Sequence, residues 1–151
     1  MRGAASRTRS AATPRPCSSV SSAVTESTVT LGRFFAAARE GRLTAIRCGG
    51  CGALAVPPKE LCPECGARRW EPVPLSGEGT IASFTVIRVA PRGHADEAPY
   101  AIAAVRLREG VSLLGRVVDV PLDSLAIGMP VRFRPIVVKD RPAIGFGPRQ
   151  P

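Results

Sequence analysis

Residues 48–66 read CGGCGALAVPPKELCPECG, and this stretch decides how the chain around it folds. Two Cys-x-x-Cys pairs, Cys48 with Cys51 and Cys62 with Cys65, supply four thiols at the short spacing that a tetrahedral metal site requires. A segment this short cannot bury a core, so a bound metal would supply the free energy that folds it. The pattern predicts a structural zinc site whose four thiolates leave no open position for Lewis-acid chemistry.

Other chemistries of the four cysteines are weaker alternatives. Iron remains possible from the donor set alone, because tetrahedral sulfur does not distinguish the two metals. Disulfides would require an oxidising compartment, and residues 1–25 contain no apolar core of a secretory signal. A thioredoxin-like redox pair needs a single Cys-x-x-Cys on a βαβ frame, which the sequence does not provide. Zinc is therefore preferred, with iron as the alternative.

A short helix is predicted before the cysteines, within residues 30–42. Thr30 is a good N-cap, and LGRFFAAAREG over residues 31–41 ends in a glycine suited to the position after a helix. Three turns are not stable alone, so the aromatic face must pack on another surface. That surface is either the rest of this chain or a second protein. We expect Phe34 and Phe35 to serve as a docking element for a partner.

The first 29 residues are predicted to be a disordered extension. They are rich in Arg and Ser, which superficially resembles an organellar transit peptide, but Pro14 and Pro16 interrupt any amphipathic helix. Cys17 is expected to be an uninvolved thiol. No apolar run in the chain approaches the roughly 18 residues of a membrane helix, so a membrane span is excluded and a cytoplasmic location is expected.

After Trp70 the sequence changes to short runs rich in β-forming residues. Strands are predicted at residues 79–89, 99–107, 111–120, 131–138 and 142–147, with a turn or short helix at 121–129. Five short strands with glycine at the bends indicate a small closed barrel, for which the OB-fold is the commonest architecture. Pro135 inside the fourth strand predicts an edge position or a bulge. We therefore expect a metal-binding domain at residues 43–74 and a barrel at residues 75–148.

One family resemblance covers the chain from about Leu31 to Pro148. The matching pieces, in order, are CGGCGALAVPPKELCPECGARRWEPVPLSGEGTIASFTV, PYAIAAVRL, LLGRVVD and IGMPVRFRP. This order resembles the bacterial and archaeal family that pairs a rubredoxin-like zinc ribbon with a C-terminal OB-fold. The resemblance implies a mainly β protein in which a short N-terminal helix and the zinc ribbon precede a five-stranded OB-fold barrel.

The resemblance also implies a function. Members of this family associate with acyl-CoA enzymes that are thiolase-like, or with hydratases and aldolases, in lipid, steroid or polyketide-type metabolism. The ribbon–barrel subunit stabilises the enzyme and helps hold the CoA ester, while the partner carries the catalytic nucleophile. The residues agree, because a chain with one His offers no convincing constellation of nucleophile, base and oxyanion donors. We expect a non-catalytic accessory subunit.

Candidate ligand residues come from the arginines of the barrel. Arg106, Arg108 and Arg116 lie on the second and third predicted strands, which form the usual binding surface of an OB-fold. Guanidinium groups suit the phosphates of CoA. The alternative is a solvated face enlarged by Arg-rich codon usage, since 19 of the 21 basic residues are Arg. The three arginines are predicted to contact CoA phosphates.

The loop at residues 90–99 brings His94, Asp96 and Glu97 together in sequence, which suggests acid–base chemistry. Three polar side chains between Gly and Pro are more typical of an exposed polar loop. We expect the exposed loop, and no catalytic residue is predicted. Tyr100 at its end is expected to be a wall or interface residue.

Nucleic-acid binding is the second hypothesis for function. The chain carries a net charge of +9, and residues 26–151 contain 17 basic and 12 acidic side chains. That sign suits nucleic acid, and both predicted domains occur in nucleic-acid-binding proteins. Single-strand binders usually offer several stacking rings, whereas few aromatic residues lie in this barrel and Phe133 is expected to point inward. Nucleic acid is therefore not the expected partner.

Overall fold

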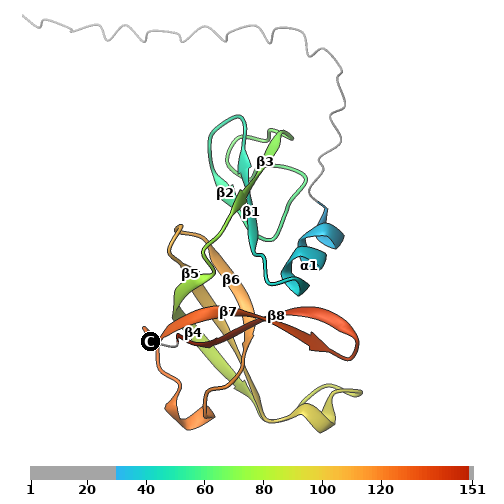
Figure 1. The fold of residues 1–151 in the computed structure, drawn as a ribbon, viewed down its shortest axis with the longest axis vertical. Helices are drawn as coiled ribbons and strands as arrows, with labels where there is room; N and C mark the ends of the chain where they lie inside the picture. Colours follow the sequence, from blue (N-terminus) through green and yellow to red (C-terminus); the bar gives the residue numbers. More distant parts are fainter. Residues whose placement is uncertain (1–29, 150–151) are drawn as a thin grey trace, which may run out of the picture.

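The computed structural model describes residues 30–149, so the predicted extension at residues 1–29, with Cys17, lies outside the described part. A three-stranded ribbon and a closed barrel lie one above the other, with a helix beside their junction (Figure 1). The elements in chain order are α1 (Leu31–Arg39), β1 (Thr44–Cys48), β2 (Leu54–Ala55), β3 (Trp70–Pro74), β4 (Glu78–Ile87), η1 (Ala95–Glu97), β5 (Tyr100–Leu107), β6 (Ser112–Val117), η2 (Leu122–Ser124), β7 (Pro130–Val138) and β8 (Arg141–Pro148). Among residues 30–149, no helix has the length and apolar character needed to cross a membrane.

Helix α1 begins and ends at the predicted signals. The Thr30 side chain accepts a hydrogen bond from the Arg33 N–H at 3.3 Å, and Gly41 follows the helix with φ 82°. The Phe34 ring is only 2% exposed and belongs to the same core cluster as the barrel side chains. The aromatic face of α1 therefore packs on this chain itself, against β7 and β8.

This packing changes the expectation for the two phenylalanines. Phe34 is occupied inside the core, so it has no surface left for a partner. Phe35 is half-buried beside it, with ring centroids 5.3 Å apart in an edge-to-face arrangement. The reason is helical geometry, since adjacent residues point about 100° apart and only one can face the barrel squarely. Of the predicted docking pair, only Phe35 keeps exposed area.

The ribbon is a three-stranded antiparallel sheet in the order β2-β1-β3. Cys48 ends the central strand and pairs with Trp70, the first residue of β3. The Trp70 Nε1–H donates to the Glu60 carbonyl at 3.1 Å, which ties β3 to the loop that carries the second cysteine pair. The sheet thus fixes both metal-binding loops at one end of the molecule.

The barrel has the strand order β4-β5-β6-β8-β7 and closes through β4 and β7. All neighbours are antiparallel except β6 and β8, which are parallel. The predicted five-stranded OB-fold is confirmed, and η2 lies in the predicted break between the third and fourth strands. The buried core joins the helix to the barrel, and its largest fully buried barrel side chains are Phe146, Ile81, Leu107, Val105 and Val131.

Two details of the barrel match the sequence pattern. Phe133 points inward as predicted, with 8% exposure and an edge-to-face contact with Phe146. Pro135 lies in the part of β7 that pairs only with β8, since β4 pairs with β7 only over residues 130–132. Proline lacks an N–H, so this edge position costs the sheet no hydrogen bond on the open side.

Candidate functional site

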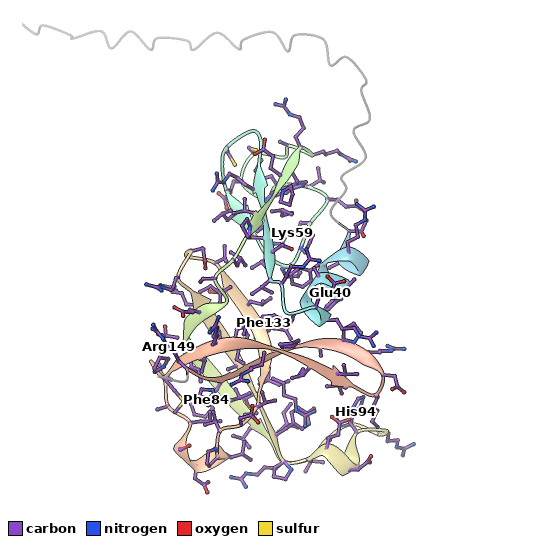
Figure 2. The ribbon with its side chains drawn as sticks, in the orientation of Figure 1. Glu40, Lys59, Phe84, His94, Phe133 and Arg149 are labelled. Carbon is purple, nitrogen blue, oxygen red and sulfur yellow. The ribbon has the colours of Figure 1, made fainter. Side chains whose placement is uncertain are left out.

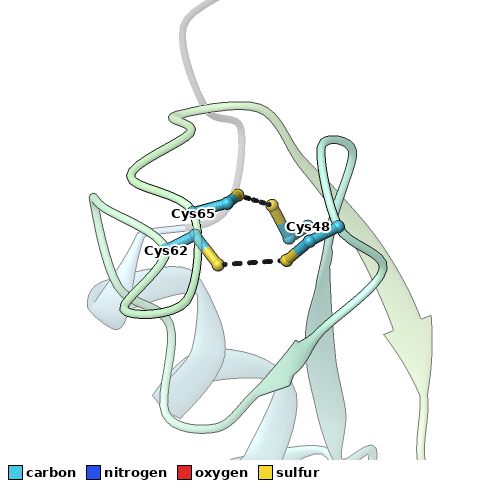
Figure 3. Close-up of side chains that lie close together, drawn as sticks. Cys48, Cys62 and Cys65 are labelled. Atoms are coloured by element: carbon cyan, nitrogen blue, oxygen red, sulfur yellow. Dashed lines mark hydrogen bonds between the residues drawn. The ribbon is translucent and has the colours of Figure 1, made fainter. Parts of the chain in front are cut away.

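The four cysteine sulfurs meet at the end of the ribbon. Cys48 ends β1 and Cys51 lies in the turn after it, and Cys62 and Cys65 lie in the loop between β2 and β3. All four Sγ atoms lie within 4.8 Å of one another. Cys48 faces Cys65 at 3.5 Å, and Cys51 faces Cys62 at 3.6 Å (Figure 3). A tetrahedron of sulfurs about 2.3 Å from zinc has S–S edges of about 3.8 Å, so the residues fit the ion.

Matching turns hold the two cysteine pairs. The Gly52 N–H donates to the Cys48 carbonyl, and the Gly66 N–H donates to the Cys62 carbonyl, both at 2.9 Å. These glycines have φ values of 76° and 70°, a region that side chains with Cβ rarely adopt. Glycine directly after each Cys-x-x-Cys is therefore a requirement of the backbone path that brings the sulfurs together.

The electrostatics of the sulfurs also call for a cation. Backbone N–H groups of Cys51 and Gly50 lower the pKa of Cys48 to about 6. The Ala53 N–H lowers the pKa of Cys51, but the neighbouring Cys62 and Cys65 sulfurs outweigh it and raise that pKa to about 12. Four thiolates this close repel one another unless a metal ion neutralises them. The chemistry of the donor set thus agrees with its geometry.

The three predicted arginines do not form one cluster. Arg108 Nη1 lies 2.7 Å from Glu78 Oε2, and Arg116 Nη1 lies 2.5 Å from Glu97 Oε2. Arg106 is exposed and has no acidic partner among residues 30–149. Because Arg116 pairs with Ile102 across β5 and β6, Arg106 and Arg116 are four residues apart, roughly 13 Å along the strand. Arg106 and Arg116 are therefore too far apart to bind the same phosphate group.

A polar network that the sequence did not predict lies at the end of the β4–β5 loop. Glu97 accepts from Arg116 and also lies 3.0 Å from His94 Nδ1. The guanidinium carbon of Arg116 is 4.4 Å from the centre of the Tyr100 ring. Arg116, and to a smaller extent His94, lower the pKa of Glu97. The loop is polar as expected, but Glu97 ties it to β6, and Tyr100 is a wall for Arg116.

The ribbon and the barrel each match a known domain family. Residues 35–71 match the family described as the ChsH2 rubredoxin-like zinc ribbon domain, and residues 72–134 match the ChsH2 C-terminal OB-fold domain. Together the two consecutive matches cover more than half of the chain. It belongs to the ChsH2-type family of zinc-ribbon and OB-fold proteins. The predicted resemblance is confirmed, and the ribbon carrying the four cysteines is a zinc ribbon.

Two curated relatives show what kinds of protein this chain is similar to. A DUF35 domain-containing scaffold protein of Methanocaldococcus jannaschii is 38% identical over 90 residues, which are 59% of this chain and 64% of that protein. A probable enoyl-CoA hydratase alpha subunit of Thermomonospora curvata is 40% identical over 98 residues, 65% of this chain and 30% of that protein. The chain therefore spans less than two thirds of either relative.

A solved structure agrees over a larger share. A chain of the structure titled Ltp2-ChsH2(DUF35) aldolase is 34% identical, with a TM-score of 0.68 over 79% of this chain and 94% of that one. The similarity therefore covers the ribbon and the barrel together.

Proposed function

We propose that this chain is a non-catalytic accessory subunit that binds and stabilises an acyl-CoA enzyme of the thiolase-like, hydratase or aldolase type. The observation that carries the proposal is the 94% coverage of a chain in the structure titled Ltp2-ChsH2(DUF35) aldolase. The scaffold and hydratase-subunit names of the two curated relatives support the same role. The subunit would act in the cytoplasm and help its partner hold the CoA ester.

The side chains of the described residues support a non-catalytic role. The chain has one histidine, and the imidazole of His94 lies against Glu97 on an outer loop of the barrel. Figure 2 places His94 at the end of the barrel remote from the ribbon, so the four thiols are far from it. Among residues 30–149, no serine or cysteine has a hydrogen bond to this imidazole, so His94 activates no nucleophile there.

A docking surface for the partner lies beside α1. The exposed side of the helix carries Leu31, which is 52% exposed, and the accessible edge of Phe35. Phe35 borders a shallow hollow of about 690 Å³ between α1 and Pro142 at the start of β8. An exposed apolar side chain next to an open hollow is typical of an interface. We assign partner docking to Phe35, while Phe34 holds the helix in place.

Of the three arginines predicted to contact CoA, only Arg106 has no acidic partner among residues 30–149. Arg108 and Arg116 already pair with carboxylates, so a phosphate would have to displace Glu78 or Glu97. Substituting Arg106 and Arg116 together by Ala should weaken CoA-ester binding in the complex. Unchanged affinity would leave both residues as surface charge.

Nucleic-acid binding finds less support in the barrel. Phe133 and Phe146 are buried, and Tyr100 lies beneath Arg116. Phe84 is half-buried, so the described barrel has no row of exposed rings for stacked bases. The net positive charge is compatible with nucleic acid but does not require it.

The proposed function is tested by affinity purification of the tagged full chain from its own cells, with and without nuclease, followed by mass spectrometry. We expect a stoichiometric acyl-CoA enzyme subunit in both samples. Phe35→Ser should reduce its recovery, and Arg69→Ser, on the exposed surface of the ribbon, is the matched control. Recovery of nucleic acid with partners that nuclease removes would contradict the proposal.

A further inference from the structure

A second pocket lies where the helix, the linker and the barrel meet. It has a volume of about 320 Å³, and its lining residues are Gly41, Ser76, Arg132, Phe133, Arg134 and Pro148. Gly41 follows α1, and Ser76 lies in the linker between β3 and β4. Figure 2 labels Phe133 near this junction, close to the level of Glu40 on the helix side. The pocket therefore combines the end of the helix, the linker and two barrel strands, β7 and β8.

Two uncompensated positive charges line this pocket. Arg132 and Arg134 stand two residues apart on β7, so both side chains leave the same face of the strand. Among residues 30–149, neither guanidinium has an acidic partner. The nearby Glu78 is already shared by Arg108 at 2.7 Å and Arg149 at 3.8 Å. The pocket therefore has a local excess of positive charge that an anion would neutralise.

A glycine on β8 leaves room for the Arg134 side chain to lie against the strand. Gly147 of β8 lies beneath this side chain, and a Cβ there would be 3.2 Å from Arg134 Cγ and 3.3 Å from its Nε. Any larger residue would push the arginine stem away from the sheet. Arg134 is half-buried where its aliphatic stem lies against Gly147.

Ser76 borders the pocket but adds no free donor to it. Its Oγ accepts from the Glu78 N–H at 3.3 Å, and its hydroxyl also hydrogen-bonds the Glu109 carboxylate. The Ser76 N–H donates to Glu109 Oε1 at 2.7 Å. The donors left for a ligand are the two guanidinium forks, which offer more N–H groups than one carboxylate can accept and match the oxygens of a phosphate group.

We propose that this junction pocket binds the phosphate or pyrophosphate group of a small-molecule ligand through Arg132 and Arg134. The inference rests on the proposed function for the source of the phosphate, which would be the CoA part of the ester. The pocket differs from the Arg106, Arg108 and Arg116 surface because its two arginines are unpaired and share one hollow.

Inorganic pyrophosphate tests the pocket with the purified, metal-loaded full chain at low salt, followed by NMR of backbone and arginine N–H signals. We expect saturable binding that shifts the signals of Ser76 and Arg134. Arg134→Met keeps the apolar stem on Gly147 and removes the charge, so affinity should fall by about tenfold or more. Arg88→Met, an equal charge loss beyond the far end of β4, should leave affinity unchanged.

Three results would overturn the proposal: no saturable binding, equal affinity in wild type and Arg134→Met, or an equal loss in the Arg88→Met control. A single-stranded oligonucleotide that binds more tightly than pyrophosphate, through the same arginines, would also overturn it. Since no partner is present, the outcome is independent of the affinity purification. Pyrophosphate binding without a co-purified enzyme would reject the proposed function and retain the pocket.

Discussion

Glu97 Oε2 lies 2.5 Å from Arg116 Nη1, and this pair ties the β4–β5 loop to the outer face of β6. The side chains are only 19% and 24% exposed, so water screens the pair less than it would an open surface pair. The second oxygen of the same carboxylate lies against His94. An arginine that the sequence suggested as a ligand contact therefore serves first to position a loop.

This pair gives stability a defined pH dependence. Arg116 and then His94 lower the pKa of Glu97 from 4.5, so its contribution is present above about pH 4.5 and is lost as the pH falls through the lowered value. Glu97→Gln should lower the melting temperature at pH 7, and the difference from wild type should vanish in acid. Thermal unfolding of both proteins across pH measures this difference in melting temperature. Loss of the metal in acid affects both proteins alike, so it cancels in the comparison. A difference that does not change with pH would contradict the account.

Removal of one sulfur ligand should abolish metal binding. In Cys62→Ser, metal content should fall from about one ion per chain to near zero, and the ribbon should unfold because the ion supplies its folding energy. Elemental analysis and the dispersion of the ribbon's NMR signals measure both effects. Cys17→Ser is the control and should keep the metal. A Cys62→Ser protein with full metal and an unchanged melting temperature would reject a four-thiolate site.

The two adjacent phenylalanines should separate stability from partner binding. Phe34→Ala removes a fully buried ring and should cost about 3–5 kcal/mol of unfolding free energy. Phe35→Ala should cost much less stability but reduce recovery of the partner enzyme. Denaturant unfolding and quantitative co-purification give the two readouts. Equal effects of the two variants on both readouts would remove the distinction.

Gly115 leaves room for the Phe146 ring in the packing of the barrel. A Cβ on Gly115 would lie 2.6 Å from the Phe146 ring, so Gly115→Ala should destabilise the protein by about 1–3 kcal/mol through overpacking. The same change at Gly32 in α1 meets no atom closer than 3.9 Å and should be neutral or stabilising by up to about 1 kcal/mol. Denaturant unfolding of the two variants makes the comparison. Equal stability of both would contradict the packing.

The local parts of this protein could be predicted from its sequence. The cysteine spacing indicated the metal site because short turns bring i and i+3 thiols together without help from distant residues. The five strands followed from alternating apolar residues, although the predicted strand at 111–120 ends at Val117 in the structure. Both signals lie within one short stretch of chain.

The contacts that depend on tertiary packing could not be predicted. Which phenylalanine of α1 faces the barrel depends on how the helix docks. The partners of Arg108 and Arg116 depend on strand register and on the path of a loop. If the register of β5 and β6 were known from the sequence, the pairing of Arg116 with Ile102 would place Arg116 near the end of the β4–β5 loop, where Glu97 lies. The pocket at Arg134 joins residues from four separate segments, and no short stretch of sequence contains them all.

The most direct test of the accessory role is an activity measurement on separated and recombined subunits. Turnover of the acyl-CoA substrate is measured in three samples. The first contains only the enzyme found by affinity purification, the second contains that enzyme with this chain, and the third contains only this chain. We predict no turnover by this chain, and higher activity and thermal stability of the partner when the chain is added. Turnover of the acyl-CoA by this chain alone would contradict the account.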